Sequence, residues 1–144
     1  MATNRPRCEI KGAVFEGWNL MSWLVLKAWL ELIKAEYFLS RGDFSRLYGR
    51  VRTFPIDAAP SAAKDRELVC RAVDLACAFY FKEVLCLQRS AVTSCLLRRY
   101  GIPAQMVIGA QQMPFRSHAW VEADGEVIND APHVRDLYMV LDRC

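Results

Sequence analysis

The hydrophobic period of the chain changes at residues 101–103, and this change limits the possible folds more than any other sequence feature. The residues before it follow a helical period, and Arg98 and Arg99 stand where a helix C-terminus favours positive charge. Gly101 just beyond the last turn and Pro103 shortly after it are typical of a helix end. The residues after it have the pattern of short strands and a hairpin. Helices followed by strands predict an α+β fold.

Three helices are predicted before this boundary. Residues 17–39 show a strong helical pattern, a second helix is predicted over 61–81 and a third over 86–100. Residues 1–12 are expected to be frayed, and residues 40–60 are expected to form a connector because they contain two glycines and two prolines. The residues that define the second helix are Ser61 as its N-cap and Leu68, Ala72, Leu75, Ala76 and Phe79 as its buried stripe.

The helix predicted over 17–39 is apolar, but it is not expected to cross a membrane. A spanning helix needs about 20 mainly apolar residues, and four charges interrupt this one. They are Lys27, Glu31, Lys34 and Glu36. We expect the helix to pack on the domain, with docking to a partner or a membrane surface as the alternative. Residues 1–60 then form a helical region packed on or docked to a core of residues 61–144, in one folding unit overall.

The second half of the chain is expected to form a small antiparallel sheet. Residues 104–110 are predicted to be a strand, residues 111–115 a loop and residues 117–130 a β-hairpin. Residues 131–144 are expected to form a short irregular or helical tail.

The length of the hairpin turn decides whether His118 and Asp130 can meet. A two-residue turn at Asp124-Gly125 would place them on opposite faces of the hairpin. A three-residue loop over 123–125 would place them opposite each other, with β-carbons about 4.5–5.5 Å apart. We predict the three-residue loop. The facing pairs are then Glu122 with Glu126, Trp120 with Ile128, and His118 with Asp130.

Composition argues against several classes of function. Apolar residues make up 53% and charged residues 24% of the 144 residues, which is typical of a globular domain. A net charge of +3 without a run of Lys or Arg is too weak to indicate nucleic-acid binding. The spacings of the six cysteines and two histidines fit no common zinc pattern, so no zinc site is expected. The polar first ten residues do not resemble a signal peptide, so we expect free thiols in a reducing cytoplasm.

An imidazole oriented by a carboxylate needs a nucleophile beside it to form a catalytic triad. Cys86 is the best-placed candidate, because it begins the helix predicted over 86–100. There the free backbone N–H groups and the helix dipole favour a thiolate, and the N–H of Cys86 itself could help to hold an oxyanion. The sequence therefore predicts Cys86, His118 and Asp130 as a catalytic site.

Other residues of the same types are weaker candidates, because they are predicted to be terminal, inside helices or outside the strand. They are Cys8, Cys70, Cys77, Cys95 and Cys144, His133 as an alternative base, and Ser90 and Ser94 as alternative nucleophiles. A structural reading stays open as well. A single cysteine is more often a small core residue than a nucleophile, and a His–Asp pair is often structural.

Two segments carry spaced motifs in a fixed order: "CLQRSAVTSCLLRRYGIPAQMVIGA" and "PFRSHAWVEADGEVIND". In the first, C-L-x-R-S leads a helix that ends in L-L-R-x-x-G, and an I-G strand follows. The second contains P-F-x-x-H-A-W-V-E, a glycine turn and N-D. This set closely resembles the transglutaminase-like leader peptidases of lasso-peptide biosynthesis. The resemblance covers about residues 65–135 well and the N-terminal helical part more loosely.

The resemblance implies a papain-like cysteine protease that cuts a ribosomally made precursor between leader and core. Cys86 resembles the family nucleophile, His118 the general base and Asp130 the residue that orients the imidazole. The implied fold has N-terminal helices, a nucleophile-bearing helix and a small antiparallel sheet. No metal or cofactor is implied.

The resemblance also implies partners. An ATP-dependent, asparagine-synthetase-like cyclase would join the freed amine to an acidic side chain. The length of the chain suggests the split form of the family, which needs a separate, winged-helix-like leader-recognition protein, and residues 17–39 are a possible docking face for it. Two other functions stay open: a transglutaminase-like acyl transferase, and a non-catalytic binding subunit of the same maturation complex.

Overall fold

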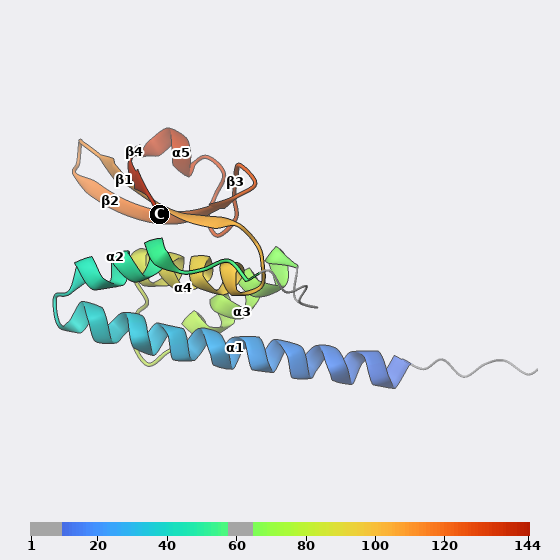
Figure 1. Cartoon of the computed structure of the whole chain (residues 1–144). Helices are drawn as coiled ribbons and strands as arrows, with labels where there is room; N and C mark the ends of the chain where they lie inside the picture. Colours follow the sequence, from blue (N-terminus) through green and yellow to red (C-terminus); the bar gives the residue numbers. More distant parts are fainter. Residues whose placement is uncertain (1–9, 58–64) are drawn as a thin grey trace, which may run out of the picture.

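A layer of helices covers one face of a four-stranded antiparallel sheet (Figure 1). The computed structural model describes residues 10–57 and 65–144, and it describes side chains from residue 19 onward within those ranges. The sheet has the strand order β3-β2-β1-β4, and its strands are β1 (Ala104–Gln111), β2 (Arg116–Ala123), β3 (Glu126–Val127) and β4 (Met139–Arg143). The helices are α1 (Ile10–Ser40), α2 (Phe44–Thr53), α3 (Arg66–Ala78), α4 (Cys86–Arg99) and the short α5 (Val134–Leu137). The predicted α+β fold class is confirmed. The prediction of an irregular or helical tail over residues 131–144 was wrong for residues 139–143, which form β4 and pair with β1.

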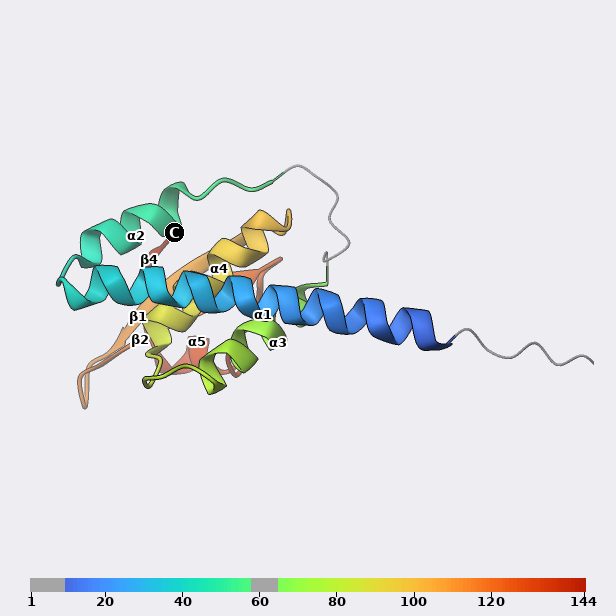
Figure 2. The same cartoon turned by 90° about the horizontal axis from the view of Figure 1, so that it is seen from below.

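Helix α4 lies between the sheet and α1 and forms the centre of the core (Figures 1 and 2). Ten of its 14 residues are buried. It packs against β1 and β2 on one side and against α1, α2 and α3 on the others. The predicted bounds of this helix and of the following strand agree with the structure to within one residue.

Helix α1 is longer than predicted and packs on α3 and α4. It begins at Ile10 instead of near residue 17. Residues 10–12, which we expected to be frayed, are therefore helical. The rest of that prediction concerns residues 1–9, which lie outside the described part of the chain. Its buried side chains are Leu24, Ala28, Glu31, Leu32 and Ala35. Within residues 10–57 and 65–144, no helix has the length and apolar character needed to cross a membrane.

Glu31 is a charged residue in the core, only 3% exposed. Its carboxylate accepts hydrogen bonds from Lys34 at 2.9 Å and Arg50 at 2.6 Å, and Arg99 lies 3.5 Å away. Burial alone would raise the pKa of Glu31, but the hydrogen bonds and charges of Lys34 and Arg50 hold it below its usual value. The cluster joins α1, α2 and α4 through one buried carboxylate.

The prediction of a connector over residues 40–60 was wrong, because α2 occupies residues 44–53. The Asp43 side chain caps this helix by accepting a hydrogen bond from the Arg46 N–H. Only Leu47 and Val51 of α2 are buried. A short, arginine-rich segment with two buried residues has too weak a periodic pattern to reveal a helix in the sequence.

The prediction for α3 was correct in type but shifted. Its predicted cap, Ser61, lies outside the described residues; α3 begins at Arg66, and Asp65 caps it by accepting from the Glu67 and Leu68 N–H groups. The buried stripe is Val69, Ala72, Val73 and Ala76. Phe79, predicted to be buried, is 79% exposed beyond the helix end.

The two faces of the sheet have different environments. Met106 and Val121 belong to the main core beneath the helices, whereas Trp120, Val107 and Val134 form a second, smaller cluster. Because side chains alternate along a strand, His118 lies on the same face as Trp120, away from α4.

Gly109 allows the Trp120 ring to lie against β1. A Cβ atom at this position would be 2.8 Å from the Trp120 ring and 2.9 Å from the Tyr138 Cβ. We expect Gly109→Ala to lower the free energy of unfolding by about 1–3 kcal/mol, because a fully buried indole and the backbone of Tyr138 would have to move. Gly49→Ala is the matched control: its Cβ meets nothing within 4 Å, and alanine favours the α2 helix. Urea denaturation of both variants tests this packing, and an undiminished stability of Gly109→Ala would contradict it.

The predicted hairpin register was wrong. Glu122 pairs with Val127 and Ala123 with Glu126, so the turn has two residues. Asp124 and Gly125 both have positive φ, 51° and 79°. This is the turn whose twist matches that of the flanking strands, and Asp-Gly favours it. We expected a two-residue turn to place His118 and Asp130 on opposite faces of the hairpin. This does not happen, because β3 ends at Val127 and Asp130 lies outside the strand.

Candidate active site

The start of α4 lies beside the His118 end of β2. The Ser90 hydroxyl donates to the carbonyl oxygen of Ala119 at 2.9 Å, which joins the helix to the residue after His118. Further along α4, the Arg98 Nε donates to the Ala104 carbonyl oxygen, and Ala104 pairs with Ala123 at the other end of β2. The helix therefore runs in the same direction as β2. Cys86, one turn before Ser90 and about 6 Å back along the axis, is near the level of His118.

The first turn of α4 is held from behind by Gln88. This buried side chain accepts a hydrogen bond from the Leu85 N–H at 2.9 Å and donates to the Glu36 carboxylate at 2.6 Å. Glu36 also accepts from Lys82, and these two hydrogen bonds lower the pKa of Glu36. The turn that carries half-buried Cys86 is thus fixed to α1 through Glu36.

His118 and Asp130 form a direct pair, with 2.6 Å between Nε2 and Oδ2. Burial by itself would raise the pKa of Asp130, but the hydrogen bonds from His118 and from the Ala131 N–H, with a smaller contribution from the nearby Arg89 guanidinium, hold it below its usual value. The carboxylate is therefore ionised at neutral pH and accepts the Nε2 proton. This leaves Nδ1 as the nitrogen that can take a proton from a nucleophile.

Aromatic rings support the imidazole. Tyr138 lies 5.2 Å and Trp120 lies 6.3 Å from the His118 ring, measured between ring centroids. The Trp120 Nε1–H donates to Glu122 at 2.9 Å, and Arg135 holds the same carboxylate at 3.0 Å. The ring next to His118 is therefore itself held by the buried Glu122 carboxylate, which is paired with the exposed Arg135.

Asn129 replaces the missing part of the β2–β3 ladder. Its Oδ1 accepts the Val121 N–H at 2.7 Å, and its Nδ2 donates to the Ser90 hydroxyl at 3.1 Å. Ser90 and Asn129 are buried, 1% and 7% exposed. The two side chains connect α4, β2 and the segment that carries Asp130. The sequence did not predict this contact between Ser90 and Asn129, although both residues lie in the quoted motifs. The two residues are 39 positions apart and meet only in the folded chain.

The competing candidates are placed less favourably for catalysis. Ser90 is buried and bonded, and Ser94 is fully buried with its hydroxyl near the Ala104 carbonyl oxygen. His133 is exposed at the start of α5. Burial raises the pKa of Cys70 and Cys95 to about 11, and it raises the pKa of Cys77 and Cys144 as well, so these thiols stay protonated. Cys8 lies outside the described residues.

Two members of the predicted triad, His118 and Asp130, are in direct contact. The third, Cys86, is placed only by the position of helix α4, which it begins. Among the described residues, no hydrogen bond joins the Cys86 thiol to His118, which lies on the sheet face away from α4. No group of three His, Cys, Asp or Glu side chains in this part of the chain could hold a metal ion. The chemistry that these residue types offer is acid–base and nucleophilic: a cysteine starts helix α4, and a carboxylate-oriented imidazole lies at about the same level of β2, on the sheet face away from α4.

The chain belongs to the transglutaminase-like superfamily, whose family model matches residues 29–143. Among curated proteins, a stretch of 56 residues is 46% identical to the microcin J25-processing protein McjB of Escherichia coli. That stretch covers 39% of this chain and 27% of the relative. No solved structure matches the chain. The transglutaminase-like core expected from the sequence motifs is thus confirmed.

Proposed function

We propose that this chain is a cysteine peptidase that removes the leader from a ribosomally made lasso-peptide precursor. The observation that carries the proposal is the His118–Asp130 pair, 2.6 Å apart, in a transglutaminase-like chain whose cysteine-bearing helix starts at about the same level of β2. The printed name of the relative, a microcin J25-processing protein, supports a peptide precursor as the substrate. The short motifs around Cys86 and His118 support the same assignment.

Each proposed catalytic residue has one role. Nδ1 of His118 takes the proton of the Cys86 thiol, and the thiolate attacks the scissile carbonyl carbon. The backbone N–H of Cys86, free at the helix start, stabilises the resulting oxyanion. His118 then gives the proton to the departing amine of the core peptide, which leaves the leader as a thioester. Water, activated by His118, hydrolyses this thioester, and Asp130 stabilises the imidazolium each time it forms.

The mechanism requires His118 and Cys86 to approach each other when substrate binds. Catalytic hydrogen bonds are often long in the free enzyme and shorten only in the substrate complex. His118 lies near the start of β2, at the end away from the turn at residues 124–125, where its backbone pairs with Gly109 of β1 and not with β3. A rotation of its side chain leaves this ladder intact.

We also propose a leader-binding protein as a partner, docked on α1, and a cyclase that uses the product. Five large apolar side chains of α1 face solvent at alternating spacings of three and four residues: Trp23, Leu26, Leu30, Ile33 and Tyr37. We call these residues the α1 face. A stripe with this spacing fits a second helix, and an exposed patch of this kind usually marks an interaction site.

The double variant Leu26→Glu, Leu30→Glu should weaken binding of the leader-binding protein at least about tenfold, because both side chains are half-exposed and two carboxylates would have to be desolvated. Leu75→Glu on α3, similarly exposed, is the control and should bind normally. Circular dichroism confirms folding, and calorimetry measures affinity. Normal binding by the folded double variant would exclude the α1 face as the docking surface.

Mass spectrometry of a precursor incubated with this chain and its leader-binding protein tests the proposed activity directly. A single cut between leader and core is the expected result, without added metal or nucleotide. Incorporation of an added amine instead of water would identify an acyl transferase. No cut in a folded complex would indicate a binding subunit and would reject the proposed peptidase.

A further inference from the structure

Arg98 is a buried cation whose partners are all uncharged. Its side chain is 7% exposed, and its guanidinium donates to the carbonyl oxygens of Ala104 at 2.7 Å, Val51 at 2.5 Å and Phe54 at 3.5 Å. These bonds use Nε and Nη1. Within residues 10–57 and 65–144, Nη2 makes no hydrogen bond and no carboxylate forms an ion pair with Arg98. A buried charge without a counter-ion is unusual and costs free energy.

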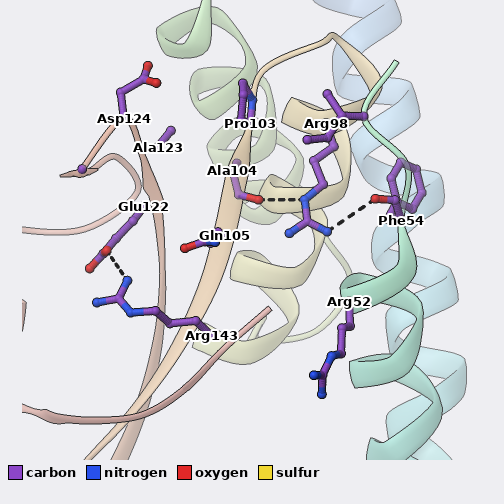
Figure 3. Close-up of a pocket in the computed structure, with 12 residues that line it drawn as sticks. Arg52, Phe54, Arg98, Pro103, Ala104, Gln105, Glu122, Ala123, Asp124 and Arg143 are labelled. Atoms are coloured by element: carbon purple, nitrogen blue, oxygen red, sulfur yellow. Dashed lines mark hydrogen bonds and ion pairs between the residues drawn. The ribbon is translucent and has the colours of Figure 1, made fainter. Parts of the chain in front are cut away.

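The Arg98 side chain lines an open cavity of about 670 Å³ at the far end of α4 from Cys86. Figure 3 shows the cavity between the segment after α2 and the end of the sheet where β2 turns into β3. Phe54, Ile56 and Pro103 give it apolar walls, and Gln105 adds an amide. This size and mixture are typical of a ligand site.

The charges around the cavity are mainly positive. Arg52 and Arg143 line it together with Arg98. Two carboxylates also line it: that of Glu122 is already paired with Arg135 and Arg143, and that of the exposed Asp124 lies 3.9 Å from Arg66. In the described part of the chain, Arg52 has no ion-pair partner within 4 Å, although after the Tyr48 hydrogen bond its charge contributes to the lowered pKa of the Asp142 carboxyl group. Two guanidinium groups, those of Arg52 and Arg98, are therefore available to an anion.

A structural role for Arg98 explains only part of this arrangement. The bonds to Val51 and Phe54 tie the end of α2 to α4, and the bond to Ala104 ties α4 to the sheet. They do not account for the unused Nη2 group, for the cavity beside it or for a second unpaired arginine on its wall. A carboxylate bound in the cavity would give the Arg98 guanidinium a charged hydrogen-bond partner, and Arg52 would add a second positive charge on the wall.

We propose that this cavity binds an acidic side chain of a peptide, flanked by apolar residues that contact Phe54 and Ile56. That the peptide is the substrate rests on the proposed peptidase function. Glu122 at the cavity is four residues after His118, about 13 Å along β2, and Arg98 is about 18 Å along α4 from Cys86. An extended substrate would thus place its acidic residue roughly four to six positions from the scissile bond.

The test uses two capped tripeptides, acetyl-Leu-Glu-Leu-amide and its neutral isostere acetyl-Leu-Gln-Leu-amide, titrated into ¹⁵N-labelled full-length protein. We expect the glutamate peptide to shift the amide resonances of Gln105 and Ala123–Gly125 and to bind about tenfold more tightly than the glutamine peptide. Arg52→Gln should remove most of this difference. Arg71→Gln on α3, an exposed arginine away from the cavity, is the control and should leave it unchanged.

Several outcomes would overturn the proposal: equal affinity for the two peptides, resonance shifts elsewhere, or an affinity insensitive to Arg52→Gln. If sodium acetate bound as tightly as the glutamate peptide, the cavity would be a site for small anions, and the proposal of a peptide ligand would be wrong. Arg98→Lys, checked for folding by circular dichroism, provides a second test, because it keeps the charge but loses Nη2. The binding needs no catalysis and should be the same in Cys86→Ala, so failure of this site and failure of the peptidase are distinguishable.

Discussion

Cys86→Ala should abolish precursor cleavage, lowering the rate by about 10³-fold or more. The thiolate is the atom that attacks the carbonyl carbon, and alanine offers no replacement. Cys86 is only half-buried at the first residue of α4, so its loss should change the free energy of unfolding little. The variant should still bind precursor and leader-binding protein, as calorimetry can show. Mass spectrometry over a time course measures the remaining cleavage.

The control for this experiment is Cys77→Ala. Cys77 is also a half-buried helical cysteine, but burial raises its pKa and it lies in α3. The Cys77→Ala variant should cleave the precursor at the wild-type rate. Iodoacetamide should modify Cys86 first, and substrate should protect it. Full activity in the Cys86→Ala variant would end the proposal that this residue is the nucleophile.

His118→Ala should reduce cleavage about as strongly as Cys86→Ala, because the thiol then has no base and the leaving amine has no acid. The double variant should be no worse than either single one, since residues that act as one unit are not additive. Asp130→Ala should cause a smaller loss, because this carboxylate orients the imidazole but does not react. Single-turnover kinetics at several pH values separates these effects from binding.

His133→Ala is the matched control for the base. His133 is exposed at the start of α5, and His118 is held by Asp130 and two aromatic rings. His133→Ala should therefore keep its activity. If instead His133→Ala lost activity and His118→Ala retained it, the assigned base would be wrong and the His118–Asp130 pair would be structural.

The local sequence was sufficient to predict an element where the residues that start and end it lie within the same segment. The bounds of α4 and β1 follow from Arg98, Arg99, Gly101 and Pro103, because capping and helix-ending residues act within one turn. The residue types of the candidate site were also readable. Cys86, His118 and Asp130 lie in short motifs, and the structure joins His118 to Asp130 as expected.

The local sequence was insufficient where distant segments decide the outcome. Helix α2 has only two buried residues of its own, and Arg50 on it is held by Glu31 from α1. The hairpin register was predicted from the need to bring His118 and Asp130 together. The chain instead forms the two-residue turn that Asp-Gly favours, ends β3 early and uses Asn129 to place Asp130.

The sequence by itself determined the succession of helices before strands, the central helix and the residue types of the site, because periodicity, capping and turn preferences act over a few neighbouring residues; it did not reveal α2 or β4. Only the tertiary structure decided which faces pack, how Ser90 and Asn129 connect the site and where Arg98 meets a cavity. Those features depend on contacts between residues 29 to 47 positions apart in the sequence, and these contacts form only when the chain folds.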